Sequence, residues 1–262
     1  MENLIEKVNN LFASFDNADM INYLTYESFA CEGLEDWTAL KSTQYFGQEC
    51  FCDCGASRFC IIPKEENFVF KASFSGMEHT LWEGDLDEYE EEKEHIKQTC
   101  YVKNENINCI TYIEPFENCF FQNQHYANYC EIEEAIYKYI EEEYPTLAPL
   151  FTKLEKIGNF YGVTVYTQPK VDEVLSETQK PHPYIKNSKE YCKVKKIFEN
   201  YHCSTLFDLH PAWVIDVMNI YGEDILRTLA EFIYNYVFDL HSSNYGWLQG
   251  KPVIFDYAGF ED

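Results

Sequence analysis

The sequence predicts an α+β protein with an antiparallel sheet and several helices. Segments 44–74 and 151–171 contain alternating or short apolar runs bounded by turn residues, which is the pattern of strands. Segments 129–143 and 225–236 instead repeat apolar residues at steps of three and four, which is the period of an amphipathic helix. With 262 residues, the chain is long enough for one large domain or two smaller lobes.

The composition is that of a folded protein with a large negative charge. A hydrophobic content of 46% with 17% aromatic residues excludes a disordered chain. The net charge of −25 repels phosphate backbones and anionic lipid, so neither nucleic acid nor a membrane is expected as a partner. The first twelve residues lack the basic start and long apolar core of a secretion signal. We therefore expect a cytoplasmic protein whose eleven cysteines are reduced.

Residues 1–40 are predicted to form a helical extension. One apolar stripe at helical spacing consists of Ile5, Val8, Leu11, Phe12 and Phe15. Nothing in this segment carries a chemical motif, so we interpret it as a packing element.

Segment 238–260 concentrates polar residues in a pattern typical of a metal site. Asp239 follows the predicted helix, Asn244 lies five residues later, and Asp256 follows twelve residues after Asn244. The turn residues 249–252 and the apolar run 253–255 predict a tight hairpin that folds back and brings these three side chains close together. Two carboxylates and an amide oxygen are ligands that suit Mg²⁺.

These residues resemble the catalytic and metal-binding loops of the protein-kinase-like superfamily, in which H-R-D-L-x-x-x-N is followed by a short hairpin and D-F-G. The matching residues are Asp239-Leu240-His241-Ser242-Ser243-Asn244 and Asp256-Tyr257-Ala258-Gly259. The D-L-H-x-x-N form is more similar to aminoglycoside phosphotransferases and to small phage and bacterial kinases. The resemblance implies ATP and Mg²⁺ as cofactors. It also implies that Asp239 is the catalytic base or hydroxyl-orienting residue and that Asn244 and Asp256 are the Mg²⁺ ligands.

The strand segment 44–74 is similar to the phosphate-binding part of the same superfamily. Gly55, Ala56 and Ser57 are small residues between two strands, where backbone N–H groups can approach a phosphate. Lys71 lies inside an apolar strand, where a lysine is costly to bury unless it meets an anion. The resemblance to a glycine-rich loop and a third-strand lysine implies that these residues bind the nucleotide phosphates and that Lys71 belongs to the catalytic set.

Segment 129–143 is predicted to be an amphipathic helix. Its apolar face is formed by Ile132, Ala135, Ile136, Tyr139 and Ile140. The resemblance implies that one glutamate of this helix pairs with the strand lysine. Glu133, at the edge of the apolar face, is the first choice and Glu134 is the alternate.

A further hairpin is expected over 151–171, with a first strand over 151–157, a loop over 158–161 and a second strand over 162–167. The resemblance implies that the end of this hairpin is the hinge between two kinase lobes, where backbone groups near Lys170 and Val171 hold adenine. Pro169 lacks a backbone N–H, so the donor must come from a neighbouring residue.

Segment 75–127 is an insertion relative to a kinase. Its eight close carboxylates between Glu83 and Glu94 are interpreted as a solvated face, followed by short aromatic strands over 109–113 and 119–121. This segment is the best candidate for a binding surface peculiar to the protein. The lysines between 186 and 196 are expected to complement the acidic insertion, with an acidic substrate as the alternative.

Cys50, Cys52 and Cys54 alternate along one predicted strand. We expect them on one face as small hydrophobes. Together with Cys60 they do not have the usual spacing of zinc-binding pairs, so zinc is the less favoured interpretation.

The resemblance implies a two-lobed kinase-like fold. Its parts are a helical extension over 1–40, an antiparallel-sheet N-lobe with one main helix over 41–171, including the insertion at about 75–127, and a reduced, mostly helical C-lobe over 172–262. The implied function is that of a small atypical protein kinase, which transfers the γ-phosphate of ATP to a hydroxyl acceptor on a protein.

Two alternatives remain open. A pseudokinase or interaction module is favoured by the single glycine of the loop, by Val237-Phe238 in place of His-Arg, and by the short C-lobe. A small-molecule kinase of the aminoglycoside-phosphotransferase type is favoured by the D-L-H-x-x-N form.

Overall fold

The computed structural model describes residues 2–15, 24–31, 33–55, 57–82, 86–106, 109–115, 120–121, 124–125, 129–173, 188–199, 211–236 and 243–257. Its fold is α+β, as predicted, with antiparallel strand pairs and several helices. The chain divides into two compact units. Unit 1 comprises Met1–Ile132 and Glu155–Gln168, and unit 2 comprises Glu133–Leu154 and Pro169–Asp262. The lobe boundaries expected from the sequence stay a prediction.

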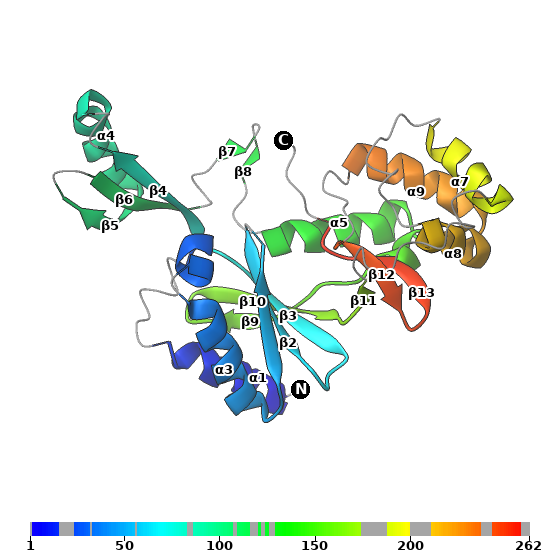
Figure 1. The fold of residues 1–262 in the computed structure, drawn as a ribbon, viewed down its shortest axis with the longest axis horizontal. Helices are drawn as coiled ribbons and strands as arrows, with labels where there is room; N and C mark the ends of the chain where they lie inside the picture. Colours follow the sequence, from blue (N-terminus) through cyan, green and yellow to red (C-terminus); the bar gives the residue numbers. More distant parts are fainter. Residues whose placement is uncertain are drawn as a thin grey trace. The chain divides into compact units, whose positions relative to one another are not determined.

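A five-stranded sheet in the order β1-β2-β3-β10-β9 forms the centre of unit 1 (Figure 1). Its strands are β1 (Cys50–Cys54), β2 (Arg58–Pro63), β3 (Phe68–Ser73), β9 (Glu155–Phe160) and β10 (Val163–Pro169). The pairs β1–β2, β2–β3 and β9–β10 are antiparallel. The strands predicted over 44–74 are therefore present and adjacent from Cys50 onward, but residues 44–46 belong to a helix that ends at Phe46.

The β9–β10 hairpin is present, but the loop predicted at 158–161 is wrong. Gly158 and Asn159 lie within β9, and the turn consists of Tyr161 and Gly162, both with positive φ (53° and 88°). Asn159 supports this turn, because its Oδ1 accepts the N–H of Gly162 at 3.2 Å. Phe151 also lies outside β9 and instead forms a parallel bridge with Ile254.

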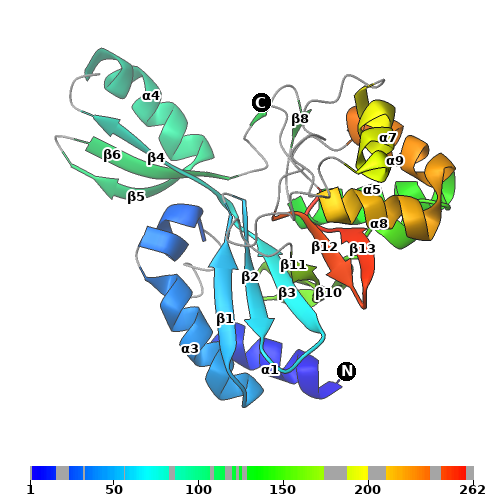
Figure 2. The ribbon, with the colours of Figure 1, turned by 45° about the vertical axis from the view of Figure 1, so that its right-hand side comes forward.

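Three helical segments of the N-terminal region accompany the sheet, namely α1 (Glu2–Ala13), η1 (Glu27–Cys31) and α3 (Leu34–Phe46). Figure 2 shows β1, β2 and β3 side by side, with α3 along β1 and in contact with α1. The predicted apolar stripe is buried at Val8, Leu11, Phe12 and Phe15, whereas Ile5 is partly exposed. The stripe packs against one face of the sheet, where the shared core includes Phe59, Ile61, Phe70, Ala72 and Val165.

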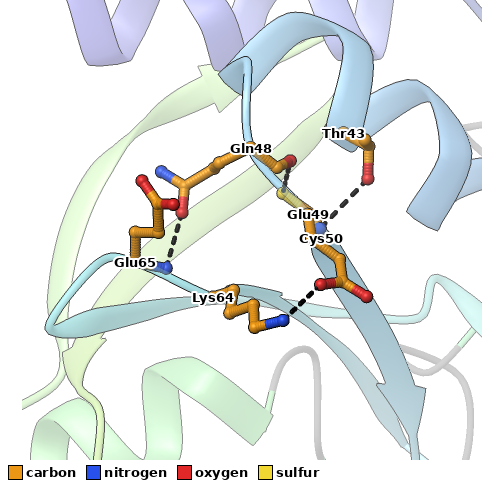
Figure 3. Close-up of polar contacts among 6 residues, drawn as sticks. All are labelled: Thr43, Gln48, Glu49, Cys50, Lys64 and Glu65. Carbon is orange, nitrogen blue, oxygen red and sulfur yellow. Dashed lines mark hydrogen bonds and ion pairs between the residues drawn. The ribbon is translucent and has the colours of Figure 1, made fainter.

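Polar contacts fasten the start of β1 to the end of α3 and to the β2–β3 turn (Figure 3). Thr43 Oγ1 accepts the backbone N–H of Cys50 at 3.0 Å, and Gln48 Oε1 accepts that of Glu65 at 2.7 Å. Lys64 Nζ lies 2.6 Å from Glu49 Oε2, and its backbone N–H donates to the carbonyl of Glu49. These contacts set where β1 begins and how it pairs with β2.

The insertion forms its own three-stranded antiparallel sheet in the order β4-β6-β5. It consists of β4 (Gly76–Trp82), α4 (Leu86–Thr99), β5 (Tyr101–Glu105) and β6 (Cys109–Pro115), and the short pair β7 (Phe120–Phe121) and β8 (Gln124–His125) follows. Ile96 of α4 packs on Ile110 of β6. The glutamates at 90, 91, 92 and 94 are exposed, as the prediction of a solvated acidic face requires.

Unit 2 is mostly helical, and the unit boundary falls inside α5, between Ile132 and Glu133. Its elements are α5 (Tyr129–Glu143), η3 (Ala148–Leu150), β11 (Asp172–Glu173), α7 (Lys189–Glu199), α8 (Pro211–Tyr221), α9 (Glu223–Tyr236), β12 (Tyr245–Leu248) and β13 (Lys251–Ile254). The predicted helices over 129–143 and 225–236 are both confirmed. Their apolar faces meet in one core, in which Ile140 and Phe232 pack with Trp213.

The predicted C-terminal hairpin is confirmed as β12–β13, with β11 added along β12 in an antiparallel sheet. Gln249 and Gly250 form its turn with φ values of 53° and 77°, as two-residue hairpin turns require. Trp213 Nε1 donates to the carbonyl of Gly246 at 2.8 Å, and the N–H of Thr152 donates to Ile254 at 2.9 Å. The hairpin is thus held against α8 and the segment after η3. Across the part of the chain that the structure describes, every helix is too short or too polar to cross a membrane.

Candidate functional site

The β12–β13 hairpin brings together the two residues predicted to bind metal. Asn244 immediately precedes β12 and is almost fully buried, and Asp256 lies two residues after β13. The N–H of Phe255 donates to the carbonyl of Asn244 at 2.8 Å, which extends the strand pairing by one step. Asn244 is therefore opposite Phe255, and Asp256 is the next residue along the chain.

Asp256 has a left-handed backbone conformation, with φ of 57°. Such a φ is uncommon for a residue other than glycine and persists where surrounding contacts hold it. Tyr257 supplies one such contact, because it is fully buried, its hydroxyl donates to the carbonyl of Thr152 at 3.0 Å, and its ring packs edge-on to Phe151. The sequence assigned Tyr257 only to the motif, and the structure adds that it anchors the backbone after Asp256.

Glu133 of α5 lies against this same turn. Its side chain is fully buried, and its Oε1 accepts the backbone N–H of Asp256 at 3.3 Å across a separation of 123 residues. A buried carboxylate is costly unless hydrogen-bond donors meet it, and the N–H of Asp256 is one such donor. Glu134, the alternate choice, is partly exposed and forms an ion pair with Lys138 at 3.0 Å.

The two residues predicted to bind metal carry side-chain oxygens. Asn244 and Asp256 offer an amide oxygen and a carboxylate, and Mg²⁺ commonly binds through one or two such groups while water and substrate phosphates complete its shell. Among the described residues, no group of three or more histidine, cysteine, aspartate or glutamate side chains is arranged to hold a metal ion. Asp239, the predicted catalytic base, lies outside the described residues, as does Ala56.

Lys71 belongs to unit 1, where it lies on β3 opposite Cys60 of β2 and is only 3% exposed. Its neighbours Phe70 and Ala72 point into the aromatic core on the other face of the sheet, because side chains alternate along a strand. A lysine in this position is buried on the second face of the same sheet, as the sequence pattern predicted.

The β1–β2 connection is a short hairpin loop closed by its own backbone. The N–H of Gly55 donates to the carbonyl of Arg58 at 2.9 Å, and the carbonyl of Ser57 accepts the N–H of Phe74 at 2.9 Å. The N–H of Gly55 is therefore engaged in closing the hairpin.

Arg58 is a buried charged residue that the sequence analysis did not single out. It is the first residue of β2 and is only 7% exposed. Its alternation with Cys60, the partner of Lys71, was the available signal, because residues two apart on a strand share a face.

Lys170 and Val171 directly follow β10 and are partly buried. A Cβ built on Gly246 comes within 2.8 Å of a methyl group of Val171, so Val171 packs closely on the backbone of β12. The predicted role of this segment in holding adenine stays a prediction.

Of the cysteines of β1, Cys50 is buried and Cys52 and Cys54 are partly buried, in line with the interpretation as small hydrophobes. Cys50 and Cys52 alternate with the exposed Phe51, and Cys50, Cys52 and Cys54 pack against the aromatic core. Burial is the main cause that raises the pKa of Cys50 and Cys54 to about 11, and it raises the pKa of Cys52 further. These thiols are therefore protonated at neutral pH and poor nucleophiles or metal ligands.

No family model, no curated protein and no solved structure matches this chain. Its function must therefore be inferred from the placement and chemistry of its own residues.

Proposed function

We propose that this protein is an ATP- and Mg²⁺-dependent phosphotransferase, a small atypical protein kinase with a two-lobed kinase-like fold. The observation that carries the proposal is the hydrogen bond from the N–H of Asp256 to Glu133 Oε1 at 3.3 Å. The resemblance to kinases assigned these two residues to one site, although they are far apart in the sequence. The resemblance implied a pairing of Glu133 with Lys71, and the observed contact adds a link between Glu133 and Asp256 that supports one shared site.

The order of elements along the chain also supports the proposal. A hairpin with small residues in its loop precedes a strand with a buried lysine, Lys71, and a helix with a buried glutamate, Glu133, follows. The β9–β10 hairpin, a set of helices and the β12–β13 hairpin come next, and the last of these carries Asn244 and Asp256. Among the described residues, these elements follow one another in the order that the resemblance implies, which supports the proposal.

In the proposed reaction the protein positions the reactants and neutralises charge, because phosphoryl transfer needs little covalent chemistry from the enzyme. Lys71 contacts the nucleotide phosphates, and backbone groups at Lys170 and Val171 hold adenine. Asn244 and Asp256 would hold Mg²⁺, which would supply the positive charge that neutralises the phosphates. Asp239 orients the acceptor hydroxyl and accepts its proton.

Glu133 is a positioning residue in this scheme, because its carboxylate holds the backbone of Asp256. The proposed acceptor is a hydroxyl group of a protein, and the proposed location is the cytoplasm.

A nucleotide-binding pseudokinase is the second candidate. The observation that favours it is the engagement of the Gly55 N–H within the β1–β2 hairpin, which leaves fewer backbone donors for the phosphates than a glycine-rich loop supplies. Such a protein would bind ATP without transferring its phosphate.

The test compares wild type with Asp239→Ala and Asp208→Ala during incubation with γ-labelled ATP and Mg²⁺. Asp208 is a matched control, because Phe207-Asp208-Leu209-His210 repeats the letters of Phe238-Asp239-Leu240-His241 without a following Asn at the same spacing. We expect label on protein, or phosphate released to water, from wild type and Asp208→Ala but not from Asp239→Ala. All three should bind ATP, which at a hundredfold excess over Kd stabilises a protein by about 2.7 kcal/mol in thermal melting.

Unchanged transfer by Asp239→Ala would overturn the assignment of the catalytic base. ATP stabilisation of wild type without any transfer would favour the pseudokinase. An absence of both would contradict nucleotide binding altogether.

A further inference from the structure

Two buried cationic side chains share one face of the β2–β3 pair. Arg58 lies opposite Ser73, and Cys60 lies opposite Lys71. Directly opposed residues in an antiparallel pair point to the same side, and so do residues two apart on one strand. Arg58 and Lys71 are therefore diagonal neighbours, with Cα atoms about 7–8 Å apart. The other side of these strands carries Phe59, Phe70 and Ala72, which pack in the aromatic core.

The burial of this pair is unusual in a chain of this charge. Arg58 is 7% exposed and Lys71 is 3% exposed. The whole chain has only 20 lysine and arginine residues against 45 aspartate and glutamate residues. Two like charges withdrawn from water beside each other destabilise the fold unless negative charge meets both. Both side chains already take part in interactions within the protein.

The neighbouring loop gives a reason for a second cation at this place. The N–H of Gly55 closes the β1–β2 hairpin on the carbonyl of Arg58, so this donor is used inside the loop. Because this backbone donor is used, the negative charge of a phosphate group bound near this hairpin must be neutralised mainly by side chains. An arginine is suited to that task, because its planar guanidinium can donate two parallel hydrogen bonds to phosphate oxygens.

The same face of the sheet is joined to the start of α5 within unit 1. Ser73, the strand partner of Arg58, accepts the backbone N–H of Cys130 through its hydroxyl oxygen at 3.2 Å. Cys130 is fully buried, so this face is covered near Ser73 and its polar groups are shielded from water. Shielding strengthens the attraction between a cation and a bound anion.

We propose that Arg58 is a second phosphate-binding residue, which works with Lys71 to hold the polyphosphate of a nucleotide. The identity of the ligand as a nucleoside triphosphate rests on the proposed function. The ligand chemistry that the site requires is a polyphosphate anion. Two cations on one face of the strands bind it, and the loop backbone donates fewer hydrogen bonds to it than a glycine-rich loop would.

The test measures binding of ATP, adenosine and inorganic tripolyphosphate to wild type, Arg58→Gln and Arg58→Lys by titration calorimetry. Lys64→Gln is the control, because Lys64 is a cation just after the other end of β2 and its side chain is 61% exposed. We expect Arg58→Gln to weaken ATP and tripolyphosphate binding at least tenfold and to leave adenosine binding unchanged. The affinity of Arg58→Lys for ATP and tripolyphosphate should lie between those of wild type and Arg58→Gln, because lysine keeps the charge but loses the bidentate geometry. Lys64→Gln should match wild type.

Wild-type affinity for ATP and tripolyphosphate in Arg58→Gln would overturn the proposal and leave Arg58 a structural residue. If Arg58→Gln fails to fold, Arg58→Lys decides, since equal loss of adenosine and ATP binding would contradict a role at the phosphates. Failure of the kinase assignment has a different signature. If tripolyphosphate binding depends on Arg58 but no label is transferred, the kinase assignment is wrong and the anion site stands. If label is transferred and Arg58→Gln binds ATP as tightly as wild type, the anion site is wrong and the kinase assignment stands. Absence of tripolyphosphate and ATP binding in wild type would overturn the anion site itself.

Discussion

The β1–β3 strands of unit 1 and the β12–β13 hairpin of unit 2 bury polar residues by different means. In unit 1 the buried cations Arg58 and Lys71 lie along strands, where alternation places them opposite an aromatic core. In unit 2 the polar residues Asn244 and Asp256 lie beyond the strand ends, where backbone contacts to neighbouring segments hold them. The burial of Arg58 and Lys71 therefore depends on the alternation of side chains along the strands, whereas the placement of Asn244 and Asp256 depends on contacts made by their backbone.

The largest expected effect concerns that close approach at Gly246 of β12. A Cβ at this position would lie 2.3 Å from the carbonyl oxygen of Asp172 and 2.8 Å from a methyl group of Val171. The Asp172 oxygen belongs to the backbone of β11 and cannot turn away, so the strands must separate. We expect Gly246→Ala to reduce the free energy of unfolding by about 3 kcal/mol, at the upper end of overpacking effects.

Gly55→Ala is the matched control in unit 1, because a Cβ there meets nothing within 4 Å. Urea unfolding of both variants, with hydrogen exchange of the β12 amides, makes the comparison. Equal stability of the two variants would mean that β11 and β12 do not approach as closely as described.

A smaller effect is expected at Glu133, which joins α5 to the turn after β13. Glu133→Ala removes the acceptor for the N–H of Asp256 and should reduce the free energy of unfolding by about 1–3 kcal/mol, the usual cost of a buried donor left without its partner. Glu134→Ala should change it by less than about 0.5 kcal/mol, because its partner Lys138 is exposed. Glu133→Gln keeps an acceptor oxygen and should recover most of the stability.

These variants are compared by urea unfolding, and Mg²⁺-dependent ATP stabilisation is measured in parallel. A greater loss in Glu134→Ala than in Glu133→Ala would contradict the assignment of Glu133 as the positioning residue.

Local periodicity explains what the sequence predicted well. The helix over 129–143 begins and ends where expected, because apolar spacing at three and four residues depends only on neighbours along the chain. The β12–β13 hairpin is likewise present because its turn residues act locally. The prediction of a loop at 158–161 was wrong. Gly158 and Asn159 are turn-forming residue types, but both lie within β9, and Asn159 supports the turn that follows the strand.

The candidate site was less accessible from the sequence. The Glu133–Asp256 contact joins distant segments, and only the resemblance to kinases placed these residues together. Arg58 follows three small residues and could not be singled out from the sequence, since its burial depends on pairing with β3. The position of Asp239 stays a prediction.

The smallest expected effect tests the turn that joins β2 and β3 (Figure 3). Lys64 and Glu49 are both more than half exposed, and their hydrogen bond and charge attraction raise the pKa of Lys64 above its usual 10.5. A raised lysine pKa in the folded state stabilises the protein below that usual pKa, and the contribution is lost as the pH rises through the folded-state pKa. Glu49→Gln should therefore lower the unfolding midpoint slightly near neutral pH in low salt. The difference from wild type should shrink in about 1 M salt, where charges are screened beyond about 3 Å.

Glu91→Gln, at an exposed position of α4, is the control for losing a surface carboxylate. Melting of the three proteins against pH and salt gives the result. If Glu49→Gln matches Glu91→Gln at low salt, the exposed pair does not stabilise this turn, and the backbone hydrogen bond from Lys64 to Glu49 and the contact of Glu65 with Gln48 hold it instead. A difference that persists in high salt would point to hydrogen-bond geometry at Glu49 rather than charge. In the first case unit 1 would, like unit 2, hold its hairpin mainly through the backbone, and the contrast between the two would then rest on the buried cations alone.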